Sequence, residues 1–251
     1  GAVLMILPKS APPAFHILAK PRGAICNLDC SYCFFLTKEM LYPNSNFRMS
    51  NESLESYVKQ TIEGHQTPEV MISWQGGEPT LMGLDFFRRA LEFEKKYKKP
   101  GQLIQHTIQT NGTLLNDEWA QSFKENNYLV GISLDGPRHL HDANRVGKGG
   151  ASTFDRVVRG VEFLKKNGAE FNILCTVNAT NQDHGAEVYR FFRDELSAQF
   201  IQFIPIVDRL MDSSLIPTNE IQVAEDADSH HAGRLRRFYS QRGHVVSSYS
   251  V

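Results

Sequence analysis

The sequence predicts an α/β protein whose parallel sheet curves into a partial (β/α)6 barrel. Six short apolar stretches that are typical of strands alternate with amphipathic stretches that are typical of helices. Several of the predicted strands end at a turn signal made of glycine, asparagine or proline. Parallel strands are joined by right-handed crossovers, and six such units are too few to close the usual barrel of eight strands. We therefore expect a curved sheet that stays open.

The predicted strands are short runs of apolar and β-branched residues. In chain order they are 15–20 before a cysteine-rich loop, 70–74 before Gly76-Gly77, 104–109 before Asn111-Gly112, 128–134 before Gly136-Pro137, 171–177, and 200–204 before Pro205. Because the carboxyl ends of parallel strands meet at one rim, the unusual residues that follow these strands should lie close together.

The predicted helices show apolar residues at a spacing of three and four. In chain order they are 50–63 with Ser50 as the N-cap, 84–98 with lysines near its C-terminus, 117–126, 153–167 ended by Gly168, and 184–196. Lysines at a helix C-terminus and a glycine just after the last turn are both signals of a helix end. From residue 208 onward the pattern fades into a polar stretch that predicts a loop or linker.

Composition narrows the function classes. The 251 residues include 27 lysines and arginines against 28 aspartates and glutamates, a formal net charge of −1, which favours neither nucleic acid nor an anionic membrane as partner. No apolar run approaches the ~18 residues of a membrane span, and the N-terminal apolar run lacks the basic start of a signal peptide. Three clustered cysteines and one remote one make a poor disulfide framework, so we expect a reducing cytoplasm.

The clustered cysteines are the most informative feature. Cys26, Cys30 and Cys33 lie within eight residues, and three thiolates on one loop can hold three irons of a 4Fe-4S cluster while leaving the fourth iron open to a small molecule. A structural zinc site is the alternative, with His16 as a possible fourth ligand. Cys175 lies in an apolar run and is predicted to be a buried strand thiol.

Four further motifs follow the predicted strands in a fixed order. They are Gln75-Gly76-Gly77-Glu78-Pro79, Thr110-Asn111-Gly112, Ser133-Leu134-Asp135-Gly136-Pro137 with His141-Asp142-Ala143-Asn144-Arg145, and Gln202-Phe203-Ile204-Pro205. Each alone is an ordinary turn, but with the cysteines in front the set resembles the radical S-adenosylmethionine enzymes. Four stretches resemble, more narrowly, the anaerobic sulfatase-maturating enzymes: Ala19-Lys20-Pro21, the cysteine loop, Ser73–Thr80 and Gln202–Pro205.

That resemblance implies a function and a set of cofactors. The reduced 4Fe-4S cluster would cleave S-adenosyl-L-methionine to a 5′-deoxyadenosyl radical, which would oxidise a cysteine or serine of a sulfatase to Cα-formylglycine. The electrons would come from a reductant such as a flavodoxin or ferredoxin. The protein would hold the reactive carbon beside one C–H bond and exclude water and oxygen.

The motifs supply candidate contacts for S-adenosyl-L-methionine. Backbone carbonyls at Gly76 and Gly77 would accept from the ammonium group, because glycine permits close approach, and Glu78 beside Gln75 would orient that end. The remaining candidates are Ser133 and Asp135 for the carboxylate or ribose, Arg145 as a fork on the carboxylate or in an internal ion pair, Phe35 or Phe34 against the adenine face, and Ile204 with Pro205 on the other side.

Two departures from the family pattern qualify the resemblance. Phe34-Phe35 stands where the family usually carries Phe-Tyr after the third cysteine, so a phenol hydroxyl is lost. The family also has a C-terminal domain that carries cysteines for two auxiliary clusters and a proposed catalytic base. Cys175 alone cannot supply the ligands of those two clusters. We therefore expect residues 1–207 to form the radical domain and residues 208–251 to lead toward an absent auxiliary-cluster domain, which favours a fragment over a short relative.

Two other functions fit part of the pattern. Another peptide-modifying radical enzyme, such as one that forms thioether crosslinks, would share the cysteine and glycine motifs. A non-catalytic metal-binding or electron-carrying module would need only the cysteines, and it would leave the motifs at Gly76-Gly77-Glu78 and at Ser133 and Asp135 without a purpose.

Overall fold

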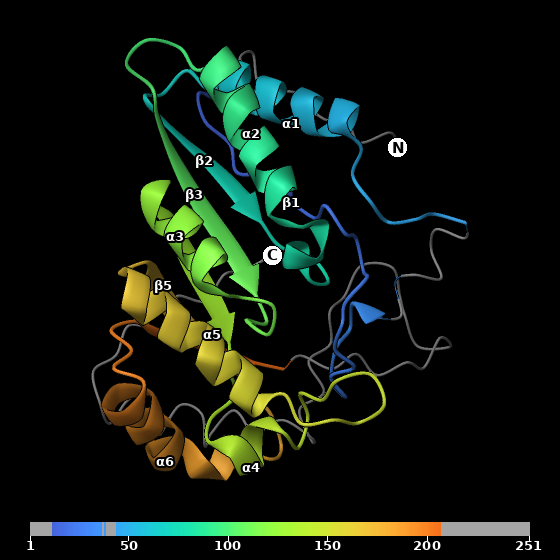
Figure 1. Cartoon of the computed structure of the whole chain (residues 1–251), viewed down its shortest axis with the longest axis vertical. Helices are drawn as coiled ribbons and strands as arrows, with labels where there is room; N and C mark the ends of the chain where they lie inside the picture. Colours follow the sequence, from blue (N-terminus) through green and yellow to red (C-terminus); the bar gives the residue numbers. More distant parts are fainter. Residues whose placement is uncertain (1–11, 37, 39–43, 207–251) are drawn as a thin grey trace, which may run out of the picture.

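The computed structural model describes residues 12–36, 38 and 44–206, and it confirms the predicted open parallel sheet (Figure 1). Each strand pairs in parallel with the next, so the order in the sheet is the order in the chain. The strands are β1 (Leu18–Ala19), β2 (Glu69–Trp74), β3 (Leu103–Thr110), β4 (Tyr128–Ser133), β5 (Glu170–Val177) and β6 (Ile201–Pro205). Within the described ranges β1 and β6 form the two edges.

Four of the five predicted helices are present as single α-helices, and the described residues also form five shorter helical elements, three of which cover the fifth predicted helix. The longer helices are α1 (Asn51–Gly64), α2 (Leu84–Tyr97), α3 (Asp117–Glu125) and α5 (Phe154–Asn167). The shorter elements are η2 (Pro79–Met82), α4 (Arg138–His141), η3 (Gln182–His184), α6 (Gly185–Arg190) and the π-helical turn η4 (Phe191–Glu195). The predicted Ser50 cap is confirmed, because its side chain accepts a hydrogen bond from the Ser53 amide.

Two predicted elements differ in detail from the structure. The helix expected over residues 184–196 is divided into η3, α6 and η4, and its last turn buries the neighbouring Phe191 and Phe192 together. Adjacent side chains on an α-helix point ~100° apart, so a wider turn helps both rings reach the core. The strand expected over residues 15–20 pairs only at Leu18–Ala19, because the chain turns back where the Lys20 carbonyl accepts from the Gly23 amide.

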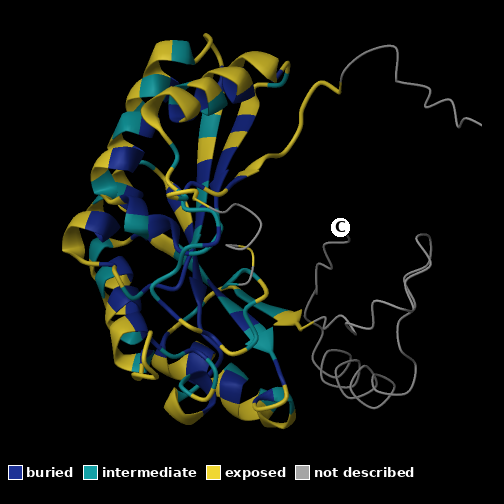
Figure 2. Cartoon of the chain, turned by 90° about the vertical axis from the view of Figure 1, so that its right-hand side faces the viewer, coloured by how far each residue is buried: buried dark blue, intermediate teal, exposed yellow. Residues whose placement is uncertain are grey.

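The core lies between the sheet and the helices that cover one of its faces (Figure 2). Alternate residues of the strands, such as Val70, Ile72 and Trp74 of β2, are fully buried there. The next residues along the strands face the opposite side, where Met71 and Leu129 stay partly exposed. The helices therefore fix the sheet from one side and leave its other face and its carboxyl rim to the loops.

None of the helices in the described ranges combines the length and apolar character needed to cross a lipid bilayer. The predicted linker, residues 208–251, lies outside the described residues. The described part of the predicted radical domain ends with β6 and Ile206.

Candidate functional site

The three clustered cysteines lie on the loop that follows β1, and hydrogen bonds fix this loop from two sides. Its Asp29 amide donates to the Val146 carbonyl (2.8 Å), and its Ser31 amide donates to the Asn144 carbonyl (3.0 Å). Leu28 is 1% exposed, and its burial anchors the middle of the loop. The cysteine loop is therefore held against the segment that ends at Arg145.

The three sulfurs are not gathered as closely as they would be around a single bound ion. One zinc ion with three thiolate ligands would bring the sulfurs to within about 3.8 Å of one another. Among the described residues, the group of three or more metal-ligating side chains whose ligand atoms all lie within 4.8 Å is a different one, so Cys26, Cys30 and Cys33 are spread more widely. His16, the possible fourth zinc ligand, instead bonds to Ser73 through Nε2 (2.9 Å).

The environment of the thiols also favours a positively charged group between them. Burial raises the pKa of the Cys26 thiol to about 11 and that of the Cys30 thiol to about 12. Repulsion by neighbouring thiolates contributes to both increases, whereas hydrogen bonds from Leu28 and Asn111 oppose the increase at Cys26 and the charge of Arg145 opposes it at Cys30. Three thiolates in such a place are costly unless iron supplies the compensating charge. The donor set thus fits a 4Fe-4S cluster with one open iron.

The two glycines after β2 pack against the backbone of the cysteine loop. The Gly77 amide donates to the Gly23 carbonyl (2.8 Å), and the Glu78 amide donates to the Ile25 carbonyl (2.9 Å). A Cβ atom at Gly77 would lie 2.1 Å from the Ile25 oxygen, and Gly76 has a positive φ of +117° beside the Gly23 carbonyl. The lack of side chains at Gly76 and Gly77 therefore lets the loop after β2 lie directly against the cysteine loop.

The carboxylate of Glu78, which we predicted to orient one end of S-adenosyl-L-methionine, is fully buried among protein donors. One oxygen accepts from the Thr80 amide (3.0 Å), the Thr80 hydroxyl (2.6 Å) and the Thr110 hydroxyl (2.7 Å), and the other accepts from the Asn111 amide (2.7 Å). Burial raises the pKa of Glu78 and these hydrogen bonds oppose the rise. The side chain therefore fastens the loop after β2 to the end of β3.

Asn111 connects the end of β3 to the first cysteine, a contact that the sequence analysis did not foresee. Its Nδ2 atom lies 2.9 Å from Asn27 Oδ1 and 3.6 Å from the Cys26 sulfur, which also accepts from the Leu28 amide (3.4 Å). Asn27 in turn donates to the Thr113 hydroxyl (2.9 Å). Hydrogen bonds to the sulfur favour its charged form, the form that ligates iron.

Asp135 and Arg145 form a buried ion pair in the structure. Arg145 Nε lies 3.1 Å from Asp135 Oδ2, and the carboxylate of Asp135 also accepts from the Thr176 amide (3.0 Å) and from the Tyr32 hydroxyl. Burial alone lowers the pKa of Arg145, but the negative charges of Asp135, Tyr32 and Cys30 together more than offset this and raise it. Of the two predicted roles for Arg145, the internal ion pair is the one present in this conformation.

Tyr32 was missed by the sequence analysis, although it lies between two of the cysteines. Its hydroxyl binds Asp135, and its ring lies 5.5 Å from the guanidinium carbon of Arg145. Burial raises the pKa of Tyr32. Since Tyr32 lies between Cys30 and Cys33, the ion pair after β4 is attached directly to the cysteine loop. Its position within the motif was the only available signal.

The other predicted contacts lie around the same rim. Gln75 Nε2 donates to Gln109 Oε1 (2.5 Å) across β2 and β3, and Ser133 ends β4 nearly buried. The rings of Phe35 and Phe34 are tilted by 36° with centroids 4.4 Å apart, and Lys20 Nζ lies 4.4 Å from the Phe35 centroid. Ile204 on β6 is 37% exposed and is the register partner of Thr176, whose amide binds Asp135. The predicted residues are thus gathered on neighbouring elements of one rim.

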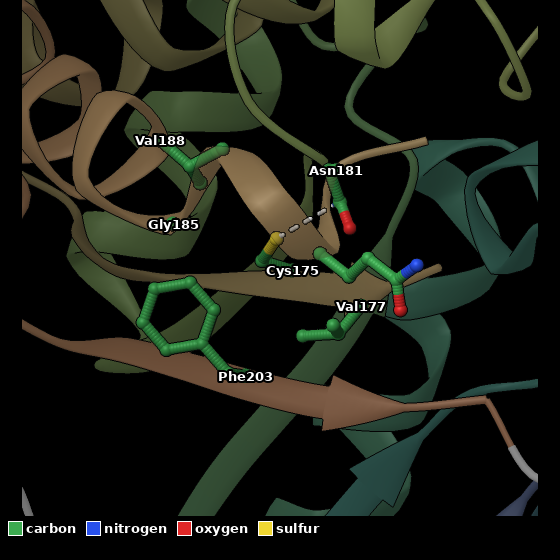
Figure 3. Close-up of a pocket in the computed structure, with 7 residues that line it drawn as sticks. Cys175, Val177, Asn181, Gly185, Val188 and Phe203 are labelled. Atoms are coloured by element: carbon green, nitrogen blue, oxygen red, sulfur yellow. Dashed lines mark hydrogen bonds between the residues drawn. The ribbon is translucent and has the colours of Figure 1, made fainter. Parts of the chain in front are cut away.

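The remaining cysteine, Cys175, is buried on β5 as predicted. It is 1% exposed, and it lines a small pocket with Asn181, Val188 and Phe203 (Figure 3). The Asn181 side-chain amide lies 3.7 Å from its sulfur. Burial raises its pKa well above the usual value for a thiol, which keeps the sulfur protonated. Cys175 is therefore a packing residue on the helix-covered face of the sheet.

His141 joins the two ends of the segment that carries Asp135 and Arg145. Its Nδ1 atom accepts from the Asp135 amide (3.4 Å), which leaves Nε2 to donate to the Thr153 hydroxyl (2.9 Å). Thr153 then donates to the Arg145 carbonyl (2.6 Å). These bonds require the neutral imidazole with its hydrogen on Nε2, and they hold the ion pair in position.

We expect His141 to make the stability of the protein depend on pH. Burial, aided by the charge of Arg145 and opposed by Asp135 and Asp142, lowers its pKa to about 4 from the ordinary value of 6.5. Between pH 6.5 and pH 4 the unfolded chain therefore binds more protons at this histidine than the folded chain does. The contribution of neutral His141 to the free energy of unfolding is present above pH 6.5 and is lost as the pH falls toward 4. Between pH 7 and 5 the loss is about 2 kcal/mol.

Urea unfolding of the cluster-free chain at both pH values measures this effect. His141→Gln should lower the free energy of unfolding at pH 7 and reduce its change between pH 7 and pH 5 by about 2 kcal/mol. The control His16→Gln, which changes an exposed histidine, should leave that change as large as in the parent. Equal pH dependence in the parent and in His141→Gln would show that His141 is not the titrating group.

Comparison with known proteins agrees with this geometry. Residues 21–192 match the family model described as the radical SAM superfamily. A serine-type anaerobic sulfatase-maturating enzyme of Bacteroides thetaiotaomicron is 44% identical over 78% of this chain and 47% of the relative. A cysteine-type enzyme of Clostridium perfringens is 40% identical over 79% of this chain and 53% of the relative.

A solved structure, native anSMEcpe with bound AdoMet, superposes with a TM-score of 0.71 at 40% identity, covering 77% of this chain and 52% of that one. The chain thus spans about half the length of the relatives that it matches. The family model covers more than half of this chain, and the open parallel sheet carries its three cysteines at the carboxyl rim. The chain therefore belongs to the radical S-adenosylmethionine superfamily.

Proposed function

We propose that this chain is the radical-generating part of an anaerobic sulfatase-maturating enzyme, which oxidises a cysteine or serine of a sulfatase to Cα-formylglycine. The observation that carries the proposal is the cysteine loop, which holds three free thiols within eight residues and whose backbone packs against the glycine motif. The choice of substrate rests on similarity to relatives of both the serine type and the cysteine type.

Cys26, Cys30 and Cys33 would hold three irons of a 4Fe-4S cluster. When bound, the reduced cluster supplies the electron that cleaves S-adenosyl-L-methionine. The chain's own residues would fix the geometry around it. The buried carboxylate of Glu78 holds the glycine loop in place, and the Tyr32 hydroxyl attaches the cysteine loop to Asp135.

We propose that the rim around the cluster binds S-adenosyl-L-methionine. Carbonyls at Gly76 and Gly77 and the side chains of Gln75 and Ser133 offer polar contacts. Arg145, which binds Asp135 after β4 and Thr176 on β5, offers a positive charge. Phe35 and Ile204 offer apolar surface for the adenine from the cysteine loop and from β6. These assignments follow from chemistry and placement at the same rim.

The partners follow from the same proposal. The substrate would be a sulfatase polypeptide, and a small electron carrier such as a flavodoxin or ferredoxin would reduce the cluster. Nucleic acid has no part in the reaction, in keeping with the net charge of −1. An open iron cluster requires a reducing compartment, which favours the cytoplasm.

The proposal can be tested by assembling the cluster anaerobically and adding S-adenosyl-L-methionine, dithionite and sulfatase peptides that carry either cysteine or serine. We expect 5′-deoxyadenosine that depends on Cys26, Cys30 and Cys33. A peptide aldehyde captured by a hydrazide probe would show in addition that this chain completes the oxidation without an auxiliary-cluster domain. A peptide that loses hydrogen without becoming an aldehyde would indicate a crosslinking enzyme. A chain that binds zinc and does not cleave S-adenosyl-L-methionine would overturn the proposed reaction altogether.

A further inference from the structure

We propose that His139, His184 and Glu187 form a second metal site, which binds a divalent transition ion of the zinc class. The three side chains come from two separate connections of the sheet: His139 from α4, after β4, and the other two from η3 and α6, after β5 (Figure 1). Their ligand atoms all lie within 4.8 Å of one another. The site shares no residue with the cysteine loop, and it does not depend on the proposed function.

The distances among the three side chains are close to those of a bound site. His184 Nδ1 lies 3.0 Å from Glu187 Oε2, and His139 Nε2 lies 3.5 Å from Glu187 Oε1. The two imidazole rings stand edge to face, with centroids 6.1 Å apart. Tetrahedral zinc with nitrogen and oxygen ligands at ~2.0–2.2 Å places neighbouring ligand atoms about 3.4 Å apart. Small side-chain rotations would therefore bring the three ligands onto one ion.

Local structure explains why the ligands meet. His184 and Glu187 are three residues apart across the start of α6, a spacing that puts both side chains on one face of a helix. On α4 the neighbouring Leu140 and His141 are buried, whereas His139 is exposed. The three side chains are between 45% and 60% exposed, so an ion can reach them from solvent.

The donor set defines the class of ion. Two imidazoles and one carboxylate are ligands that zinc takes in proteins, and three protein ligands leave one position for water. Imidazole favours zinc, copper and nickel over the hard cations magnesium and calcium, which prefer oxygen ligands. We therefore expect binding of Zn²⁺ that an excess of Mg²⁺ does not reverse.

A metal ion at this site would connect α4 and α6, the two segments that follow β4 and β5. α4 lies between Asp135 and Arg145, and α6 follows β5, which carries Thr176. An ion bound by both α4 and α6 would link two segments. One is the connection after β4, which carries Asp135 and Arg145, and the other is the helix that follows β5. Since an ion that binds only the folded chain stabilises it by mass action, Zn²⁺ should raise the unfolding temperature.

The test is calorimetric titration with Zn²⁺ alone. The parent for this test is the whole chain with Cys26, Cys30 and Cys33 changed to serine and His230 and His231 changed to glutamine, which removes the other clustered ligands in the sequence. We expect one equivalent of Zn²⁺ to bind, and His184→Ala and Glu187→Gln each to weaken the affinity by roughly tenfold or more. The matched control, His16→Ala, removes an exposed histidine elsewhere and should bind like the parent.

A second measurement covers the case in which the multiple variant does not fold. The unmodified chain with its cluster assembled has its thiols occupied, and Zn²⁺ should raise its unfolding temperature while leaving that of His184→Ala unchanged. Absence of Zn²⁺ binding in the folded parent would overturn the proposal. Equal affinity in the parent, His184→Ala and Glu187→Gln would overturn it as well.

Discussion

Replacing Cys30 with alanine is expected to abolish assembly of the iron–sulfur cluster. Cys30 is the most buried of the three clustered cysteines, at 9% exposure, and it lies between the other two in the sequence. Alanine offers no ligand, and two thiolates cannot hold the three irons that this loop would bind. The variant should lose most of the iron, the acid-labile sulfide and the charge-transfer absorbance after anaerobic reconstitution.

Cys175→Ala is the matched control, because it makes the same chemical change at a buried cysteine outside the loop. It removes packing beside Val188 and Phe203, so it should lower stability by about 1–2 kcal/mol and keep the full iron content. Full retention of iron and sulfide by Cys30→Ala would refute the ligand assignment. Loss of iron from both variants would mean that the assay reports on folding instead.

The open sheet and most element ends could be predicted because local signals set them. Periodicity of apolar residues placed the strands, and the Ser50 cap and the Gly168 end bounded helices to within a residue or two. The division of residues 182–195 into three kinds of helix was not predictable in this way. It depends on where Phe191 and Phe192 must pack, and the sequence carries no local signal for that.

The site was predicted as a set of residues but only partly as a set of contacts. A motif indicates which residues gather at the rim, because every parallel strand ends there. It does not indicate whether a carboxylate faces a ligand or the protein. Glu78 and Asp135 both face protein donors, and their partners come from other segments: Thr110 from the end of β3 and Tyr32 from the cysteine loop. Such pairings between distant segments appear only when the loops are placed in space.

Gly77→Ala is expected to disrupt the cysteine loop as well as the proposed binding of S-adenosyl-L-methionine. The new methyl group would lie 2.1 Å from the Ile25 oxygen and 2.8 Å from the Ala24 carbonyl carbon. Both are backbone atoms, so no side-chain rotation relieves the contact. The loops must separate, with loss of the hydrogen bonds from the Gly77 and Glu78 amides. We expect a loss of about 3 kcal/mol in unfolding free energy, at the upper end for overpacking.

Gly101→Ala separates this steric effect from the general cost of replacing a glycine. Gly101 has a φ of +80°, but a Cβ there meets nothing within 4 Å, so only backbone strain of about 1–2 kcal/mol is expected. Iron content after reconstitution and the urea midpoint should both fall in Gly77→Ala, whereas Gly101→Ala should keep its iron. A Gly77→Ala variant with full iron content would show that the glycine loop does not hold the cysteines in place, because the clash lies directly on the backbone that precedes Cys26.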